Sequence, residues 1–285
     1  MPSYDSSRGR FRLADQHIAV LGHLADRETP PDELAQPLAE LQHIGLVGPE
    51  GELSPLLIDL VGAFADPMVM IRVEVTGEHG AVNHGMIVGQ EAVIAHDGWP
   101  GEEESEYVSV EPARLVWELA RLVNLRDIKP VELPVARVET TMGVLDAAFV
   151  ALGDTPGIEL VEAASLARKA IAEAGGPAEP ALYVFADLVA ALNCTWRVTT
   201  AWDTKQDGER AAAIRALAVW DCGRLGYWIR ERPEEPILPG QVGPDTELHL
   251  VRAGSGELWD QLADLLPDVE DLMVEPEEPE ESAKP

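Results

Sequence analysis

The sequence predicts an α+β protein made of two similar helix–sheet–helix units, and three observations lead to this fold class. An apolar helix, a tight connection, a strand, a polar break and a second apolar strand occur in the same order twice, within residues 57–95 and 183–220. Short connections between successive strands are typical of antiparallel meanders. An apolar helix that begins at a Trp closes each copy, at residues 117–123 and 259–266. The pattern therefore predicts a duplicated body with pseudo-two-fold symmetry.

The first unit is expected at residues 12–128, after a polar and flexible N-terminus at residues 1–11. Ser54 and Pro55 form a favourable helix start, because Ser accepts a hydrogen bond from the first turn and Pro fits the first helical position. The expected helices cover residues 13–24, 34–44, 55–64 and 112–124, and the expected strands cover residues 68–75, 85–88, 91–96 and 107–110.

The second unit is expected at residues 129–266 and forms one compact body with the first. Its helices are expected at residues 135–152, 160–174, 183–192 and 255–266, and its strands at residues 194–202, 211–220, 225–230 and 247–251. The remaining residues, 267–285, are rich in Glu and Pro and are expected to form a disordered acidic tail.

Alternation along the best strand of the second unit predicts two distinct sheet faces. Arg197 and Thr199 fall on one face. The other face is apolar and aromatic. It carries Cys194, Trp196, Val198, Thr200 and Trp202. The helices that precede and follow each set of strands are expected to cover one of these faces.

The charge of the chain limits its partners. With 51 acidic and 21 basic residues, the formal net charge is −30. Nucleic-acid binding depends on Lys and Arg contacts to phosphates, so this balance argues against a nucleic-acid partner. An anionic membrane surface would repel the chain for the same reason. A basic or apolar protein partner fits the charge better.

The location of the chain is expected to be cytoplasmic. Its first ten residues lack the apolar segment of a secretory signal. No run of about 18 apolar residues is present, so membrane insertion is not expected. The two cysteines, Cys194 and Cys222, do not form a disulfide framework and are expected to be free thiols.

No motif in the sequence predicts catalysis, a cofactor or a metal. His79, His84 and His96 lie in one hairpin region, but they lack the spacing of a known metal motif and are interpreted as solvated histidines. No nucleotide-binding glycine motif and no nucleophile motif occurs. The chain is therefore expected not to be an enzyme, although an enzyme with an unrecognised pocket stays an alternative.

The tryptophans are the candidate contact residues, because Trp and Tyr are enriched at binding hot spots. Trp202, Trp220 and Trp228 lie near strand ends in the second unit. They are predicted, together with Tyr227, to bind a partner. Trp117 and Trp259 occupy equivalent positions in the two closing helices and are predicted to belong to the core.

An alternative interpretation concerns residues 14–62, whose helices and following loop have the arrangement of a winged-helix domain. The candidate recognition helix contains Glu40 and neither Lys nor Arg. Phosphate contacts dominate DNA affinity, so a helical packing unit is favoured over a DNA reader. An acidic winged-helix regulator or scaffold stays open as the second hypothesis.

Residues 41–67, which read LQHIGLVGPEGELSPLLIDLVGAFADP before a predicted strand, resemble the EspG family of type VII (ESX) secretion chaperones. The strand and helix at residues 107–123, the Pro-flanked linker at 130–134 and the end of the second unit at 248–266 are also similar. The resemblance implies a quasi-two-fold α+β body with a central antiparallel sheet and two helical groups. It also implies a cytosolic, non-catalytic protein that binds the helical tip of a PPE protein in a PE–PPE pair and keeps the pair soluble for export.

Overall fold

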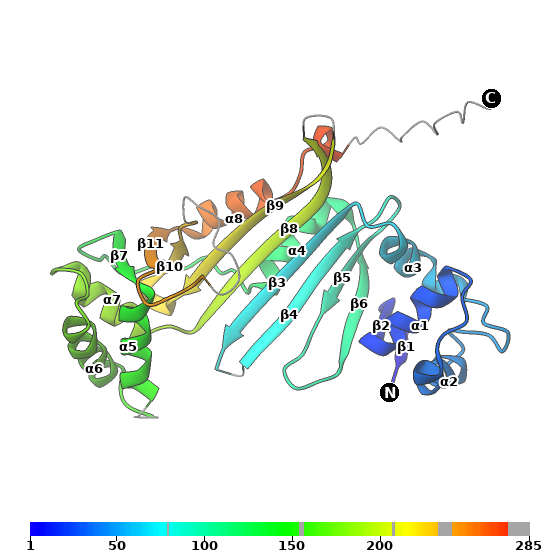
Figure 1. The fold of residues 1–285 in the computed structure, drawn as a ribbon, viewed down its shortest axis with the longest axis horizontal. Helices are drawn as coiled ribbons and strands as arrows, with labels where there is room; N and C mark the ends of the chain where they lie inside the picture. The colour runs from blue at the N-terminus through cyan, green and yellow to red at the C-terminus, as the bar shows by residue number, and fades with distance from the viewer. Residues whose placement is uncertain (79, 154–156, 207–208, 233–240, 273–285) are drawn as a thin grey trace.

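A computed structural model describes the chain except for residues 79, 154–156, 207–208, 233–240 and 273–285. Within the described part, eleven strands form one sheet in the order β1-β2-β6-β5-β4-β3-β8-β9-β10-β11-β7, and the neighbours are antiparallel (Figure 1). The strands are β1 Ser3–Asp5, β2 Arg10–Ala14, β3 Val69–Gly77, β4 Gly80–Val88, β5 Val93–Asp97, β6 Glu104–Val110, β7 Arg137–Thr141, β8 Cys194–Gln206, β9 Glu209–Asp221, β10 Tyr227–Arg230 and β11 Glu247–Ala253.

The helices form three groups around this sheet. Short 3-10 turns precede α2, α3 and α4. Before α3, Ser54 accepts a hydrogen bond from the backbone N–H of Leu56, as the Ser-Pro helix start predicted. The helices are α1 Asp15–Ala25, α2 Ala35–His43, α3 Ile58–Ala65, α4 Leu115–Leu122, α5 Met142–Gly153, α6 Leu160–Glu173, α7 Ala181–Ala190 and α8 Ser255–Asp264.

The two halves of the chain meet where β3 pairs with β8, from Val69 opposite Trp202 to Gly77 opposite Cys194. Outward from this seam the order is β3-β4-β5-β6-β2-β1 in the first half and β8-β9-β10-β11-β7 in the second. Each half contains a strand, three helices, a four-stranded meander and a closing helix, and the first half has the additional strand β1 before them. The predicted α+β class with duplicated units is confirmed, and the repeat is one strand longer than the sequence pattern indicated.

Two predicted boundaries are wrong at the start of the units. Residues 1–11 were expected to be flexible, but Ser3–Asp5 forms β1 and Arg10–Ala14 forms β2, which pairs with β6. The predicted helix at 135–152 begins instead with the strand β7, Arg137–Thr141, before α5. Strands β2 and β7 are each five residues long and lie directly before a helix. The helical apolar pattern that follows therefore hides their alternation.

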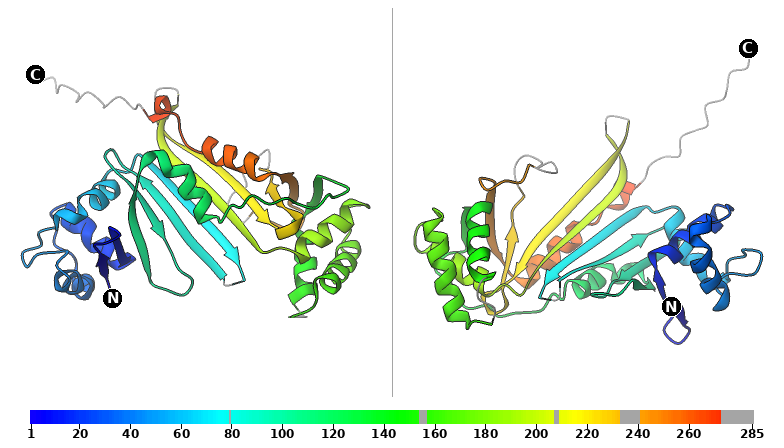
Figure 2. Two further views of the ribbon diagram at one scale, coloured as in Figure 1. Left: turned by 180° about the vertical axis from the view of Figure 1, so that it is seen from behind. Right: turned by 60° about the horizontal axis from the view of Figure 1, so that its bottom comes forward.

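One face of the sheet, here called the closed face, is covered by α4 and α8 (Figure 2). Val73 and Val198 of the central strands are fully buried there, against Leu119 of α4 and Leu258 of α8. The predicted two-face alternation of β8 is confirmed, because its apolar and aromatic set points to this closed face.

The other two helical groups lie at opposite ends of the second face. Phe11, Ile94 and Tyr107 of that face belong to the core formed with α1, α2 and α3. At the far end, Trp228 and Leu250 belong to the core formed with α5, α6 and α7. The two groups therefore flank the middle of this face, as Figure 1 shows.

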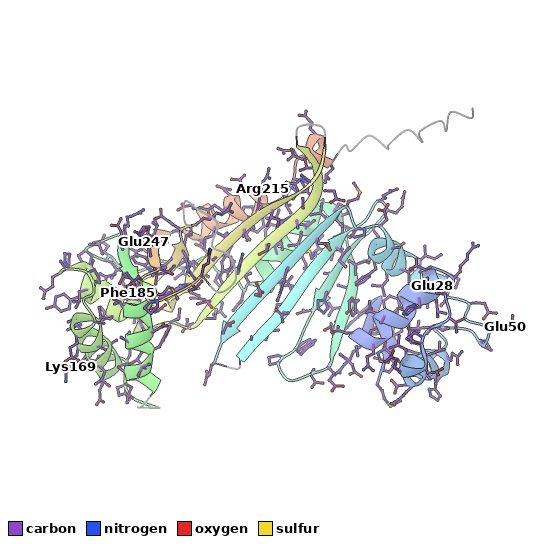
Figure 3. The ribbon with its side chains drawn as sticks, viewed as in Figure 1. Glu28, Glu50, Lys169, Phe185, Arg215 and Glu247 are labelled. Atoms are coloured by element: carbon purple, nitrogen blue, oxygen red, sulfur yellow. The ribbon has the colours of Figure 1, made fainter. Side chains whose placement is uncertain are left out.

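The C-terminal segment adds a contact on the closed side. Val269–Leu272 forms a 3-10 turn, and Asp271 lies 3.4 Å from Arg215. Arg215 of β9, which is labelled in Figure 3, also donates to the carbonyl oxygen of Leu266 at 2.6 Å. The predicted disordered tail at 267–285 is thus ordered up to residue 272, and the rest of it lies outside the described residues. No helix within the described ranges is both long and apolar enough to span a membrane.

Candidate partner-binding face

The middle of the second face, here called the open face, is formed by β3, β8 and β9. Its residues follow from the register, because alternate side chains of paired strands point to the same side. They are Met70, Arg72 and Glu74 of β3, Arg197, Thr199 and Ala201 of β8, and Ile214, Ala216 and Ala218 of β9.

The first feature of the open face is an apolar row. Met70 lies opposite Ala201, and Ala201 lies opposite Ile214. Met70 is 55% exposed and Ile214 is 61% exposed. Large exposed apolar side chains that line up across three paired strands mark a surface suited to a partner.

The second feature is a basic row on the same face. Arg72 pairs with Glu74 on its own strand at 3.0 Å. Glu74 lies opposite Arg197, and both Arg197 and Arg230 of β10 lie opposite Ala218. The open face thus combines apolar and cationic side chains in a chain with a formal net charge of −30.

Additional apolar side chains are exposed at one end of the α5–α7 group. Phe149 and Val150 lie near the end of α5, and Leu160 and Val161 lie at the start of α6. All four are exposed, and Val161 is 83% exposed. In Figure 1 this end of the group lies on the same side as the turn between β3 and β4.

The four predicted contact residues are buried, so they are not surface anchors in this structure. Trp202 and Trp220 are each 6% exposed, Tyr227 is 1% exposed and Trp228 is fully buried. Trp202 lies under the Arg215 guanidinium, at 4.8 Å. Trp202 and Tyr227 face α4 and α8, whereas Trp220 and Trp228 lie under α5–α7. Their position near strand ends did not predict exposure, because a helical group covers each of those ends.

Hydrogen bonds also hold two of these residues in the core. The indole N–H of Trp228 donates to the carbonyl oxygen of Leu225 at 3.3 Å. The Tyr227 hydroxyl accepts from the backbone N–H of Arg126 at 3.0 Å. Buried Trp and Tyr need such partners for their polar atoms, so these contacts fit structural roles.

Trp117 shows the reverse error. Trp117 and Trp259 were both predicted to lie in the core, but Trp117 is 67% exposed, whereas Trp259 is partly buried and packs against the core. Their rings contact edge to face, with centroids 4.6 Å apart. They line an open groove of about 630 Å³ between α4 and α8, which also includes Leu125 and Ser255. The leucines of these helices face the sheet, so Trp117 on the other side of α4 points outward.

The histidines do not gather into one site. His84 lies on the closed face, with Nδ1 2.7 Å from a carboxylate oxygen of Asp97. His96 lies on the opposite face, stacked on Tyr107, and burial lowers its pKa below the ordinary value. His79 lies outside the described residues. Among the residues with described positions, no three His, Cys, Asp or Glu side chains are grouped as a metal site.

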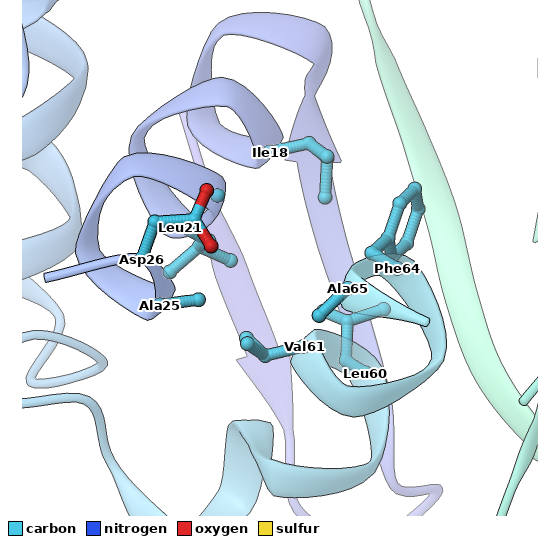
Figure 4. Close-up of a pocket in the computed structure, with 9 residues that line it drawn as sticks. Ile18, Leu21, Ala25, Asp26, Leu60, Val61, Phe64 and Ala65 are labelled. Carbon is cyan, nitrogen blue, oxygen red and sulfur yellow. The ribbon is translucent and has the colours of Figure 1, made fainter. Parts of the chain in front are cut away.

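A smaller apolar cavity lies between α1 and α3 (Figure 4). It has a volume of about 270 Å³, and Ile18, Leu60 and Phe64 line it, with Asp26 at its edge. Most of its lining belongs to residues 14–62, for which the sequence suggests a winged-helix domain as an alternative. There the carboxylate of Glu40 in α2 lies 3.0 Å from the imidazole of His17 in α1. Helices α1 and α2 both pack on the core beneath the sheet, so no contact in this region favours a DNA reader.

Together the fold and the open face define a duplicated α+β protein in which, among the described residues, no helix covers the sheet surface between two helical groups. This fold is similar to that of the type VII secretion system chaperone EspG5 of Mycobacterium tuberculosis, which was solved in complex with a PE25–PPE41 dimer. The alignment has a TM-score of 0.50 and covers 90% of this chain and 97% of that chain, at 13% sequence identity. No family model and no curated protein matches the sequence.

Proposed function

We propose that this protein is a non-catalytic, cytosolic chaperone of the EspG type that binds the helical tip of a PPE-like client in a PE–PPE pair. The open face is the proposed binding surface, with the exposed end of the α5–α7 group beside it. Binding would cover apolar client surface until export. The observation that carries the proposal is the exposed row of Met70 and Ile214 on a sheet face that no helix of the described part of the chain covers.

The physical character of the open face supports this role. A specific protein complex buries about 800 Å² on each partner, and a few central side chains contribute most of the affinity. Met70, Ile214 and the exposed side chains of α5 and α6 supply apolar contacts on a rigid scaffold. A rigid apolar surface with polar neighbours suits a helix end, because a helix presents side chains from successive turns as a compact group.

The fold similarity supports the same role from a different direction. The similar chaperone was solved in complex with a PE25–PPE41 dimer. The duplicated sheet and the two flanking helical groups of this chain offer the same kind of scaffold. The proposal extends this similarity to a helical client for the present chain.

Affinity purification from the cytosol of the encoding organism tests the proposal. The wild-type chain is expected to retain a helical PE–PPE-like pair, identified by mass spectrometry. Met70→Asp combined with Ile214→Asp is expected to reduce recovery of that pair more than tenfold, because two carboxylates would enter an apolar contact.

Ile58→Asp is a matched control, because Ile58 is 68% exposed on α3 and lies outside the open face. Circular dichroism verifies that all variants are folded. Full retention of the pair by the double variant would show that the open face is not the client surface. Repeated recovery of no helical client by the wild-type chain would remove the proposal.

A further inference from the structure

The basic row of the open face contains two arginines that share one neighbour. Arg197 of β8 and Arg230 of β10 lie on either side of Ala218 of β9, because each is opposite Ala218 in the register. All three side chains point to the open side of the sheet. Ala218 contributes only a methyl group, so the strand between the two arginines leaves space for both guanidinium groups.

The charges of this pair are close enough to affect one another. Burial and then the nearby charge of Arg197 lower the pKa of the Arg230 guanidinium below its ordinary value. Glu74 is opposite Arg197 in the register, but its carboxylate pairs with Arg72 at 3.0 Å. Arg230 contacts the sulfur of Met142 at 3.7 Å, which is a weak acceptor.

Several other arginines of the protein have close carboxylate partners. Arg10 lies 2.7 Å from Glu106, and Arg137 lies 2.7 Å from Glu231. Within the described residues, no such carboxylate contact is present for Arg197 or Arg230. Two adjacent cations without a carboxylate are unfavourable in isolation, and a bound anion would relieve their repulsion. The planar guanidinium group matches a carboxylate through two parallel hydrogen bonds.

We propose that Arg197 and Arg230 bind carboxylate groups of the client, so that the open face selects a helical tip carrying Asp or Glu beside its apolar residues. This inference rests on the proposed chaperone function and adds the charge of the preferred partner. The apolar row then supplies contact area, and the arginine pair supplies orientation and selectivity.

The chain has its own acidic segments, and these are the competing occupants. Residues 275–281 contain five Glu, and Glu234 and Glu235 follow β10 in the sequence. The last described turn, which precedes the first of these segments, contacts Arg215 on the closed side of the sheet. That departure point favours an external partner over the C-terminal acidic segment.

Two synthetic helical peptides test the assignment directly. Both carry the same leucine face, and one carries four Glu at positions where the other carries Gln. Calorimetry with the full chain at low salt is expected to show about tenfold tighter binding of the Glu peptide, or about 1.4 kcal/mol. Arg197→Gln combined with Arg230→Gln is expected to remove this preference, because the variant lacks the two cations.

Arg8→Gln combined with Arg114→Gln is the matched control, since it removes two exposed arginines outside the open face. This control is expected to keep the Glu preference. Met70→Asp with Ile214→Asp is expected to weaken both peptides, so it reports the proposed client surface separately from the charge preference.

Equal affinity for the Glu and Gln peptides would overturn the arginine assignment while leaving the client-capture test of the open face unaffected. A Glu preference that persists in Arg197→Gln/Arg230→Gln would also overturn it. If a preference emerges only after residues 273–285 are deleted, or only with Glu234→Gln and Glu235→Gln, the occupant is the chain itself. That result would overturn the assignment to a client.

Discussion

The two faces of the central sheet carry apolar side chains in the same strands, yet they have different roles. On the closed face, Val73 and Val198 are fully buried under α4 and α8. On the open face, Met70 and Ile214 remain more than half exposed between two helical groups. The closed face therefore supplies much of the stability of the fold, whereas the open face keeps large apolar side chains exposed.

The largest expected effect concerns the buried Trp228. Trp228→Ala is expected to lower the free energy of unfolding by about 3–5 kcal/mol, because it removes a fully buried indole from the core. Trp117→Ala is the comparison and is expected to lower it by about 1 kcal/mol, mainly through the lost ring contact with Trp259. Urea unfolding followed by far-ultraviolet circular dichroism measures both. A larger loss for Trp117→Ala than for Trp228→Ala would contradict the assigned positions.

The next largest effect tests whether α4 packs on the closed face. Leu119→Ala in α4 is expected to lower the free energy of unfolding by about 2–5 kcal/mol, since Leu119 is fully buried against the sheet. The same urea titration measures this change. A loss below about 1 kcal/mol would mean that α4 does not pack firmly on this face.

Much of the sheet was predictable from local sequence patterns, because alternation and short connections are properties of neighbouring residues. The meander strands and the two faces of β8 followed from them. The pairing of β3 with β8 did not, since these strands are distant in the sequence and nothing local encodes their contact. Whether a Trp is buried also depends on which helices cover its face. Trp117 and Trp228 were therefore assigned to each other's environments.

A smaller effect concerns the ion pairs that attach α4 to β5. Asp97 lies 2.7 Å from His84 and 3.0 Å from Arg121 of α4. Burial alone would raise the pKa of Asp97, but the hydrogen bonds from His84 and Arg121 outweigh it and lower the pKa below 3.8. The folded state therefore favours the ionised carboxylate, so its contribution is present above pH 3.8 and is lost as the pH falls through the lower folded value.

Asp97→Asn is accordingly expected to lower the free energy of unfolding by about 1.5 kcal/mol at neutral pH. The difference from the wild-type chain is expected to shrink as the pH falls below 3.8. Urea unfolding at a series of pH values measures this difference. A difference that stays constant down to the lowest pH at which the chain folds would contradict the ionised pair.

The smallest effect is expected on the open face itself. Ile214→Ala is expected to change the free energy of unfolding by about 0.5 kcal/mol or less, because Ile214 is 61% exposed and makes little contact within the chain. Urea unfolding of the isolated chain measures it. A loss above about 2 kcal/mol would show that the chain covers this residue and that the face is not open.

Labelling of introduced cysteines tests whether the client binds the open face. The native thiols provide a low background, because burial and then the charge of Asp221 raise the pKa of Cys194 to about 11, and burial also raises the pKa of Cys222. Met70→Cys and Ile214→Cys place a thiol on the open face, and Trp117→Cys places one on the outer side of α4.

Maleimide labelling is then measured for the free chain and for its complex with the captured client. All three introduced thiols are expected to react in the free chain. In the complex, labelling at positions 70 and 214 is expected to slow at least tenfold, while labelling at position 117 stays unchanged. Protection at position 117 alone, with unchanged labelling at positions 70 and 214, would place the client on the opposite side of the sheet and contradict binding at the open face.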